Sequence, residues 1–146
     1  MATAVSTSMS ARNQLNGTIK DIHHGQAMSV VTIRVGEKEI VSAVTNEACK
    51  ELDLKSNDRV AAIIKSTEPI LITGDEGLVK LSARNKLTGH VIGIQKGNAM
   101  ACVTLESGAL RLTASITRQA ADELRLNNGD RVTAAFKATE VMLQKL

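Results

Sequence analysis

Apolar and β-branched residues of this chain are gathered into short stretches separated by turns, a pattern typical of β-strands. Between the third and fourth of these stretches the period changes, and apolar residues recur at the spacing of a short helix, from Thr45 to about Leu54. The expected order in the first half is therefore three strands, a helix and two strands. The predicted strands lie at 15–22, 27–35, 39–45, 59–66 and 70–73.

The second half of the chain repeats the first at a constant offset of 72 residues. Residues 82–89, with the sequence SARNKLTG, repeat residues 10–17, with the sequence SARNQLNG. Roughly 40% of the aligned positions are identical without a gap, which indicates a duplicated folding unit. We predict a tail at 1–9, a first domain at 10–73, a linker at 74–81 and a second domain at 82–146. Units this small are near the lower limit for an independent core, so they are expected to stay in contact.

Both helices are predicted to begin after a threonine, because Thr45 and Thr117 precede the helical pattern and threonine is a good N-cap. On the first helix, Ala48 and Leu52 are expected to lie on one side. The second helix is expected to stop at Asn128-Gly129, where glycine can adopt a left-handed conformation. Its predicted inward-facing residues are Ala120, Ala121 and Leu124.

The order of elements predicts an all-β protein made of two tandem OB-like five-stranded barrels, each with one short helix. Pro69 lies between the last two predicted strands of the first unit, where no backbone donor is required.

The composition argues against several classes of function. Phe136 is the only aromatic residue, and OB domains that bind nucleic acid rely on aromatic platforms for the bases. The formal net charge is only +3 and has no block of like charge, although a modest basic excess suits small anions. No apolar run is long enough to span a membrane. Residues 1–9 lack the features of a secretory signal, so a cytoplasmic location is expected.

The sequence contains no recognisable catalytic or metal-binding constellation. Cys49 and Cys102 occupy non-equivalent positions outside any paired motif, and we expect two small buried thiols. His23 and His24 are expected in a solvent-exposed turn, and their role stays open. The acids that both units share are expected to be surface or turn residues, among them Glu68 and Glu140.

A set of hydrogen-bond donors and cations does repeat. Each unit has a Ser-Ala-Arg segment at its start, a threonine at a helix N-terminus, and a lysine late in a strand, Lys65 or Lys137. Such groups together could bind a tetrahedral oxyanion without any chemistry. Each residue by itself also has an ordinary explanation as a helix cap or a surface charge, and duplication alone would repeat them.

The motif SARN(Q/K)L-x-G, the later Gly-x-Ala segment, the Thr-opened helix and the late K-(A/S)-T-E segment are similar to the Mop domain of the molbindins. These belong to the transport-associated OB (TOBE) domains. Two such units over about 10–146 resemble a tandem, or di-Mop, molbindin. The resemblance implies a cytoplasmic protein that binds molybdate, and also tungstate, for storage or homeostasis. It also implies a homotrimer whose ring holds six Mop domains, with oxyanion sites between domains.

The resemblance also implies which residues contact the oxyanion. In the first unit these are Ser10, Ala11 and Arg12 at the entrance, and Thr45, Lys65 and Ser66 in the facing part. In the second unit they are Ser82, Ala83 and Arg84, and Thr117, Lys137 and Ala138. Because Ser66 is replaced by Ala138, the backbone N–H is expected to matter more there than the side chain. No side chain is expected to ligate a bare metal cation, and symmetry-axis sites cannot be placed.

One alternative is that the chain binds molybdate as part of a larger regulator or transporter. The same tandem domains form the molybdate-sensing part of some regulators and the tail of some transporter ATPases. No helix-turn-helix and no phosphate loop precede Ser10, so a complete regulator is not expected, whereas a fragment of one stays open. An enzyme is not expected. Affinity, the number of anions and the choice between storage and delivery also stay open.

Overall fold

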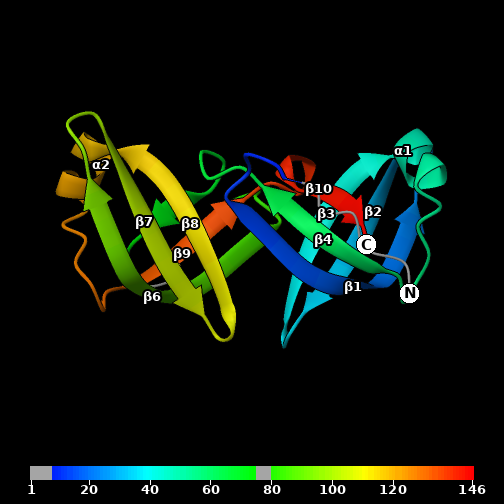
Figure 1. Cartoon of the computed structure of the whole chain (residues 1–146), viewed down its shortest axis with the longest axis horizontal. Coiled ribbons are helices and arrows are strands. Elements are labelled where there is room, and N and C mark those ends of the chain that lie inside the picture. Colours follow the sequence, from blue (N-terminus) through cyan, green and yellow to red (C-terminus); the bar gives the residue numbers. More distant parts are fainter. Residues whose placement is uncertain (1–7, 75–79) are drawn as a thin grey trace.

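The computed structural model describes residues 8–74 and 80–146, so most of the predicted tail and residues 75–79 of the predicted linker lie outside the described residues. Two curled, five-stranded antiparallel sheets lie side by side (Figure 1). This confirms the predicted fold class, a nearly all-β chain with few short helices. The elements of the first half are β1 (Asn13–His24), β2 (Met28–Val35), β3 (Lys38–Thr45), α1 (Asn46–Glu51), β4 (Arg59–Ile64) and β5 (Ile70–Ile72).

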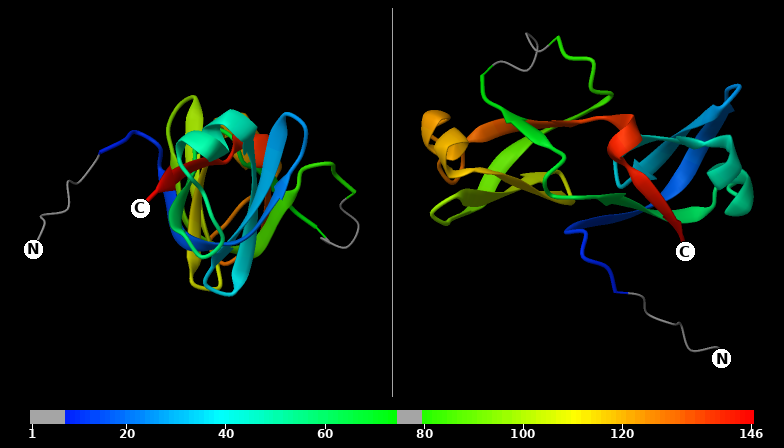
Figure 2. Two further views of the ribbon diagram at one scale, coloured as in Figure 1. Left: turned by 90° about the vertical axis from the view of Figure 1, so that its right-hand side faces the viewer. Right: turned by 90° about the horizontal axis from the view of Figure 1, so that it is seen from above.

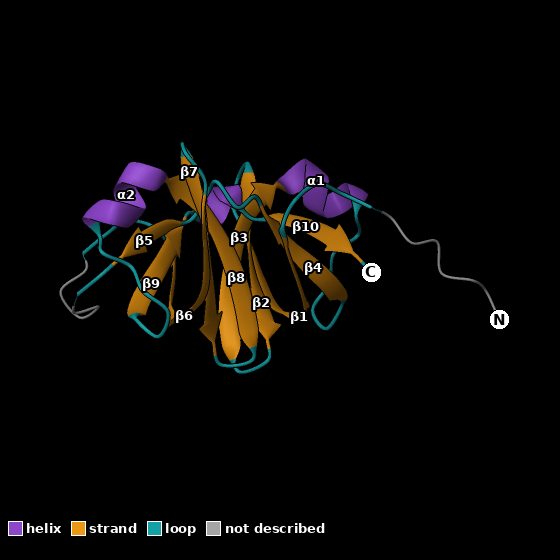
Figure 3. Ribbon diagram, turned by 60° about the vertical axis from the view of Figure 1, so that its left-hand side comes forward, coloured by secondary structure: helices purple, strands orange, loops and turns teal. Residues whose placement is uncertain are grey.

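The second half repeats this order with one addition, a 3₁₀ turn before its last strand. Its elements are β6 (Asn85–Lys96), β7 (Met100–Ser107), β8 (Leu110–Thr117), α2 (Arg118–Glu123), β9 (Arg131–Phe136), η2 (Ala138–Glu140) and β10 (Met142–Lys145). The helices lie at the upper ends of the sheets and the β2–β3 and β7–β8 hairpins at the lower end (Figure 3).

The two halves exchange their last strands. The first sheet has the order β10-β4-β1-β2-β3, and the second has the order β5-β9-β6-β7-β8. Figure 2 shows β10, in red, lying with the first half of the chain. The predicted strand at 70–73 is therefore present, but it pairs with β9 rather than with β4, its neighbour along the chain. Each five-stranded sheet therefore takes four strands from one half of the sequence and one strand from the other half.

Two buried asparagine side chains are among the contacts that join the halves in addition to the exchanged strands. The amide of Asn85, at the start of β6, accepts a hydrogen bond from Val41 N and donates one to Val41 O, both at 2.8 Å. The equivalent Asn13 makes the same pair of 2.8 Å bonds with Thr113 on β8. Both asparagines are only 3% exposed. Each amide therefore extends an edge strand of the opposite half in the way a neighbouring strand would.

The first strand of each half carries a glycine that lies very close to the backbone of the neighbouring strand. A Cβ atom on Gly17 would lie 2.4 Å from the Arg34 carbonyl oxygen, and one on Gly89 would lie 2.1 Å from the Glu106 carbonyl oxygen. Only glycine allows so close an approach of two backbones. The pairing register then shifts two to four residues later, between Ile19 and Asp21 in β1 and at the equivalent place in β6.

Both helices begin as predicted and end earlier. The hydroxyl oxygens of Thr45 and Thr117 accept hydrogen bonds from Ala48 N and Ala120 N, at 3.0 Å in both cases. The helices last six residues, and the first left-handed residue after α2 is Arg125 with φ 52°, not Gly129, which comes later in the turn with φ 91°. Leu124 is half-buried and packs against the core, in agreement with its predicted inward orientation, whereas Leu52, the leucine after α1, is 37% exposed.

One apolar cluster runs through both halves. Phe136 is 1% exposed within it, which confirms that the single aromatic residue belongs to the core, and the other members are aliphatic side chains and Cys49. Cys102 corrects the prediction of two buried thiols, because it is half-buried and its Sγ atom lies 3.6 Å from the Ser115 hydroxyl. A core shared in this way suits two units that are each too small to bury much apolar surface alone.

Candidate functional site

Strand pairing brings each Ser-Ala-Arg segment beside the late lysine of its own unit. Asn13 on β1 pairs with Ile64 on β4. Arg12, just before β1, and Lys65, just after β4, are therefore neighbours across the two strands. Asn85 pairs with Phe136 across β6 and β9, which places Arg84 next to Lys137 in the same way. These four cations are exposed. The structure therefore brings together one arginine and one lysine of the predicted set at each junction between the halves.

Each of these junctions packs against the opposite half of the chain. Ser115 on β8 donates from its hydroxyl to the Ser66 hydroxyl at 2.8 Å, and Ser115 N donates to Ser66 O at 2.7 Å. On the other side, Ala138 begins η2, which packs against β3, and the Ser42 hydroxyl donates to Val141 O. Within one chain, Lys65 and Ser66 therefore lie against β8, the strand that ends at Thr117.

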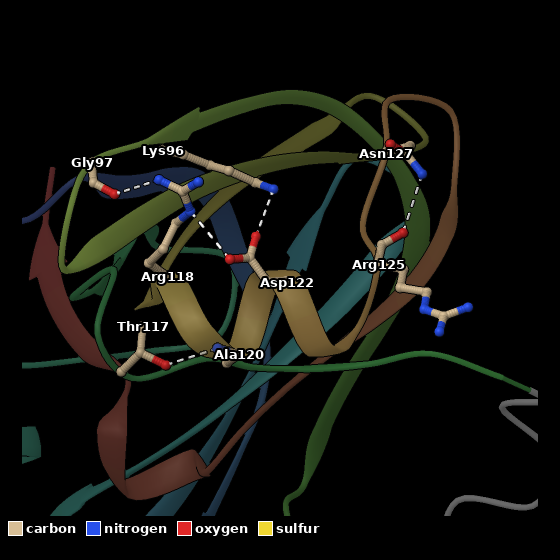
Figure 4. A network of polar contacts seen from close by, with 8 residues as sticks. All are labelled: Lys96, Gly97, Thr117, Arg118, Ala120, Asp122, Arg125 and Asn127. Carbon is tan, nitrogen blue, oxygen red and sulfur yellow. Dashed lines mark hydrogen bonds and ion pairs between the residues drawn. The ribbon is translucent and has the colours of Figure 1, made fainter.

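The two predicted threonines lie far from each other. Thr45 precedes α1 and Thr117 precedes α2, and these helices lie at opposite ends of the molecule (Figure 1). Both side chains are exposed and already accept the capping hydrogen bond from their own helix. Figure 4 shows this bond for Thr117. One chain thus does not gather all twelve predicted residues at a single place.

A cavity of about 240 Å³ opens at the second junction, next to η2. Three of the predicted residues line it: Ser82, Ala83 and Lys137. Ala83 is only 8% exposed, whereas Ser82 and Lys137 are exposed. The remaining lining residues are Glu68, Ile70, Leu81, Ala135, Phe136 and Glu140. The cavity thus combines a hydroxyl and an ammonium group with an apolar wall and two carboxyl groups.

The two glutamates of this cavity are the site feature that sequence reasoning missed. Glu68 and Glu140 are equivalent in the duplication, and their carboxyl groups are hydrogen bonded to each other. This contact raises the pKa of Glu68 and lowers the pKa of Glu140, which also accepts a hydrogen bond from Lys137 N at 2.9 Å. The only signal in the sequence was that both units carry the acid at the same place. That signal does not show that the two copies meet.

The turn beside α2 contains a charged network (Figure 4). Asp122 accepts hydrogen bonds from Lys96 Nζ at 2.9 Å and from Arg118 Nε at 3.3 Å, and Arg118 also donates to Gly97 O at 3.1 Å. The hydrogen bond from Lys96 lowers the pKa of Asp122, and Arg118 adds to the effect. Arg118, Asp122 and Thr117 line a shallow cavity of about 810 Å³. Of the two arginines that line this cavity, Arg118 is paired with Asp122, and the other is Arg125.

The first half has a neutral network at the equivalent place. His24 Nδ1 lies 2.9 Å from the Ser29 hydroxyl, which donates to the Asn46 side chain, and Asn46 donates to Gly25 O at 2.9 Å. His23 and His24 are exposed as predicted, but they end β1 rather than lying in a turn, and His24 helps to link the β1–β2 turn to the start of α1. Within residues 8–74 and 80–146 no three histidine, cysteine or acidic residues are grouped so that they could hold a metal ion.

The sequence matches the model of the TOBE domain twice, at residues 9–71 and 81–143. The chain belongs to the TOBE domain family. The duplication found in the sequence is therefore a tandem of TOBE domains, and the exchange of β5 and β10 joins the two. No helix in the described part of the chain is both long and apolar enough to cross a membrane.

Several relatives of this TOBE tandem have names that refer to molybdenum. The chain is 39% identical over 142 residues to the molybdenum transport protein ModE of Herbaspirillum seropedicae, covering 95% of this chain and 52% of that protein. It thus spans about half the length of that relative. It is also 39% identical over 66 residues to molybdenum-pterin-binding protein 1 of Clostridium pasteurianum, covering 44% of this chain and 97% of that protein.

A solved structure matches the whole tandem. The cytoplasmic molybdate-binding protein ModG, in a form with molybdate bound, superposes with a TM-score of 0.91 at 34% identity. The match covers 96% of this chain and 100% of the ModG chain. A likeness of this extent includes both TOBE domains and their relative placement.

Proposed function

We propose that this protein binds molybdate, and tungstate as its analogue, and serves as a cytoplasmic molybdenum store or buffer. The observation that carries the proposal is the end-to-end likeness to ModG with molybdate bound. The donor set agrees with it, because Arg12 lies next to Lys65 and Arg84 next to Lys137. Cations beside hydroxyl and backbone N–H groups bind a dianion by charge-assisted hydrogen bonds and need no reaction.

We further propose that the complete sites lie between chains of a homotrimer. The predicted residues of one chain fall into separate groups, with Thr45 and Thr117 at the outer ends and the arginine–lysine pairs at the junctions (Figure 1). If a neighbouring copy brought its helix end to such a junction, the two groups would face one anion. The proposed contacts are Ser10, Ala11, Arg12, Thr45, Lys65 and Ser66, with Ser82, Ala83, Arg84, Thr117, Lys137 and Ala138.

Calorimetric titration of the full chain with molybdate, tungstate, sulfate and phosphate tests the proposal, with the mass of the assembly measured in the same samples. Molybdate and tungstate should bind, and the mass should be three times that of one chain. Absence of heat with both anions would refute the function, and a monomeric mass with tight binding would refute the shared sites.

Arg12→Ala and Lys65→Ala test the assigned residues. Each should weaken molybdate binding about ten- to a hundredfold, the effect of losing one charge-assisted hydrogen bond. Both side chains are exposed, so the unfolding midpoint should not change. Lys50→Ala removes an exposed cation from α1 and is the matched control, which should bind as the parent does. Unchanged affinity in both test variants would show that the oxyanion binds elsewhere.

A second candidate is the oxyanion-sensing part of a larger regulator or transporter. It is favoured by one observation, that the chain spans only 52% of the ModE relative. An immunoblot of the source cells separates the two candidates. A band near 15.5 kDa supports the stand-alone protein, and a band of about twice that mass supports the second candidate.

A further inference from the structure

A cavity of about 530 Å³ lies at the lower end of the molecule, and none of the proposed oxyanion residues lines it. It is lined by the second half of the chain and by Lys38 from the β2–β3 hairpin of the first half. The two hairpin tips meet there (Figure 3), and the Lys38 Cε atom lies 3.8 Å from the position of a Cβ atom on Gly108. Its volume falls in the range of small-molecule sites.

Strand register explains why cations collect in this cavity. Lys86, Thr88 and His90 alternate with buried residues on β6, so they share its outer face. His90 pairs with Arg131 on β9 and with Glu106 on β7. The face therefore carries Lys86, His90 and Arg131, and Lys38 completes it from the other half.

The charges of the two lysines are not balanced locally. Among residues 8–74 and 80–146, neither Lys38 nor Lys86 has a carboxylate partner, whereas Lys20, Lys96 and Lys145 all do. The one acid of the cavity, Glu106, is paired with Arg111 at 3.2 Å. An anion entering the cavity would thus meet lysines that have no competing internal ion pair.

The floor of the cavity is held rigidly by short contacts. The Ser107 hydroxyl donates to Thr88 O at 2.6 Å, and the Thr88 and Thr133 hydroxyls lie 2.9 Å apart. Gly89 is packed against the Glu106 carbonyl so tightly that no side chain fits. A rigid floor keeps the loss of side-chain freedom on binding small.

The equivalent face of the first half lacks most of these cations, although the two halves are duplicates. Gln14 stands in place of Lys86, Thr18 in place of His90 and Leu110 in place of Lys38, while Arg59 corresponds to Arg131. The basic cavity is therefore a feature of one half only. It is not a by-product of the duplication that repeats the proposed oxyanion residues.

We propose that this cavity binds a small ligand with two or more linked phosphate groups. Lys86 and His90 stand about 13 Å apart along the strand at their Cα atoms and Lys38 approaches from the other half, so the basic side chains are spread along the cavity rather than gathered at one point. A chain of phosphates can contact both ends and Lys38 at once. The site is independent of molybdate binding, since it contains none of the residues proposed for that function.

Titration of the full chain with inorganic tripolyphosphate tests the proposal, with ADP and orthophosphate as comparison ligands. Tripolyphosphate should bind at least tenfold more tightly than orthophosphate, and its binding should weaken as salt is added. ADP binding more tightly than tripolyphosphate would identify a nucleotide as the ligand class, and the reverse would identify inorganic polyphosphate. Equal affinity for orthophosphate and tripolyphosphate would overturn the proposal.

The first half supplies variants that the fold already tolerates. Lys86→Gln and His90→Thr install the residues found at the equivalent positions, and Lys38→Leu does the same for the hairpin. Each should weaken tripolyphosphate binding about two- to tenfold, and the triple variant should abolish it. The control, Lys50→Gln with Lys80→Gln, removes two exposed lysines elsewhere and should have no such effect.

Molybdate titration of the same variants separates this proposal from the proposed function. The triple variant should bind molybdate as the parent does, and Arg12→Ala should bind tripolyphosphate as the parent does. Tripolyphosphate binding that survives in the triple variant would overturn the site. Loss of tripolyphosphate binding in Arg12→Ala would show that both anions share the oxyanion site, and would equally overturn it.

Discussion

Removing the amide of Asn85 should destabilise the whole chain, because this one side chain joins the two halves through two hydrogen bonds. It is 3% exposed, and both bonds to Val41 are 2.8 Å long. Asn85→Ala leaves the N–H and C=O of Val41 without partners on a half-buried strand. At about 1–3 kcal/mol for each of the two unsatisfied groups, the expected loss of unfolding free energy is about 2–6 kcal/mol. For a chain of this size the melting temperature should fall by roughly 5–15 °C.

Urea unfolding followed by circular dichroism measures this loss, with Gln14→Ala as the control. Gln14 is exposed and its amide bonds only to the nearby Ala11 O, so its removal should change the unfolding free energy by less than about 0.5 kcal/mol. Asn13→Ala should reproduce the large effect, since Asn13 makes the equivalent bonds to Thr113. If Asn85→Ala costs no more than the Gln14→Ala control, the two bonds do not join the halves as argued.

The Asn85→Asp variant distinguishes the contribution of the hydrogen bonds to stability from the contribution of side-chain packing. An ionised aspartate keeps an acceptor for Val41 N but places a second oxygen against Val41 O. Protonation at acid pH restores a donor, so this variant should recover part of its stability relative to the parent as the pH falls. A constant deficit at all pH values would mean that shape, and not hydrogen bonding, accounts for the cost.

Two other changes have clear expected outcomes. Gly89→Ala should cost about 2–3 kcal/mol in urea unfolding, because the new Cβ atom would meet the Glu106 carbonyl oxygen at 2.1 Å. Gly93→Ala, whose Cβ would meet nothing within 4 Å, should cost almost nothing, and equal costs would contradict the close approach. Glu68→Gln should alter the pH dependence of stability. Contact with Glu140 raises the pKa of Glu68. The stabilisation that protonated Glu68 gives the folded state is therefore fully present below the unfolded-state pKa, near pH 4.3, and is lost as the pH rises through the folded-state pKa. Glutamine stays neutral, so the variant should lack this decline and gain stability over the parent near neutral pH, whereas the exposed Glu37→Gln control should not. If the unfolding free energies of Glu68→Gln and the parent differ by the same amount at all pH values, the hydrogen bond between the Glu68 and Glu140 carboxyl groups does not control this pH dependence.

Much of the local structure follows from the sequence. Short-range patterns place the strands and the threonine caps of both helices, because each depends on the conformational preferences of a few neighbouring residues. The constant offset of the duplication predicts that both halves have the same elements. The helix ends were less predictable, since Asp53 and Arg125 adopt left-handed conformations that glycine would favour. The turns that contain Asp53 and Arg125, rather than the preferences of these two residues alone, impose the left-handed conformation.

The three-dimensional fold decides which parts of the two halves meet. β5 has the same local pattern whether it pairs with β4 or with β9, so no short-range signal could predict the exchange of strands. The same holds for Asn85 on Val41, for Glu68 against Glu140, and for Lys38 beside Gly108. Each of these contacts joins residues more than 40 positions apart. The sequence by itself determines the elements and the repeated set of hydrogen-bond donors and cations, and the exchange of strands between the two halves determines where those groups lie.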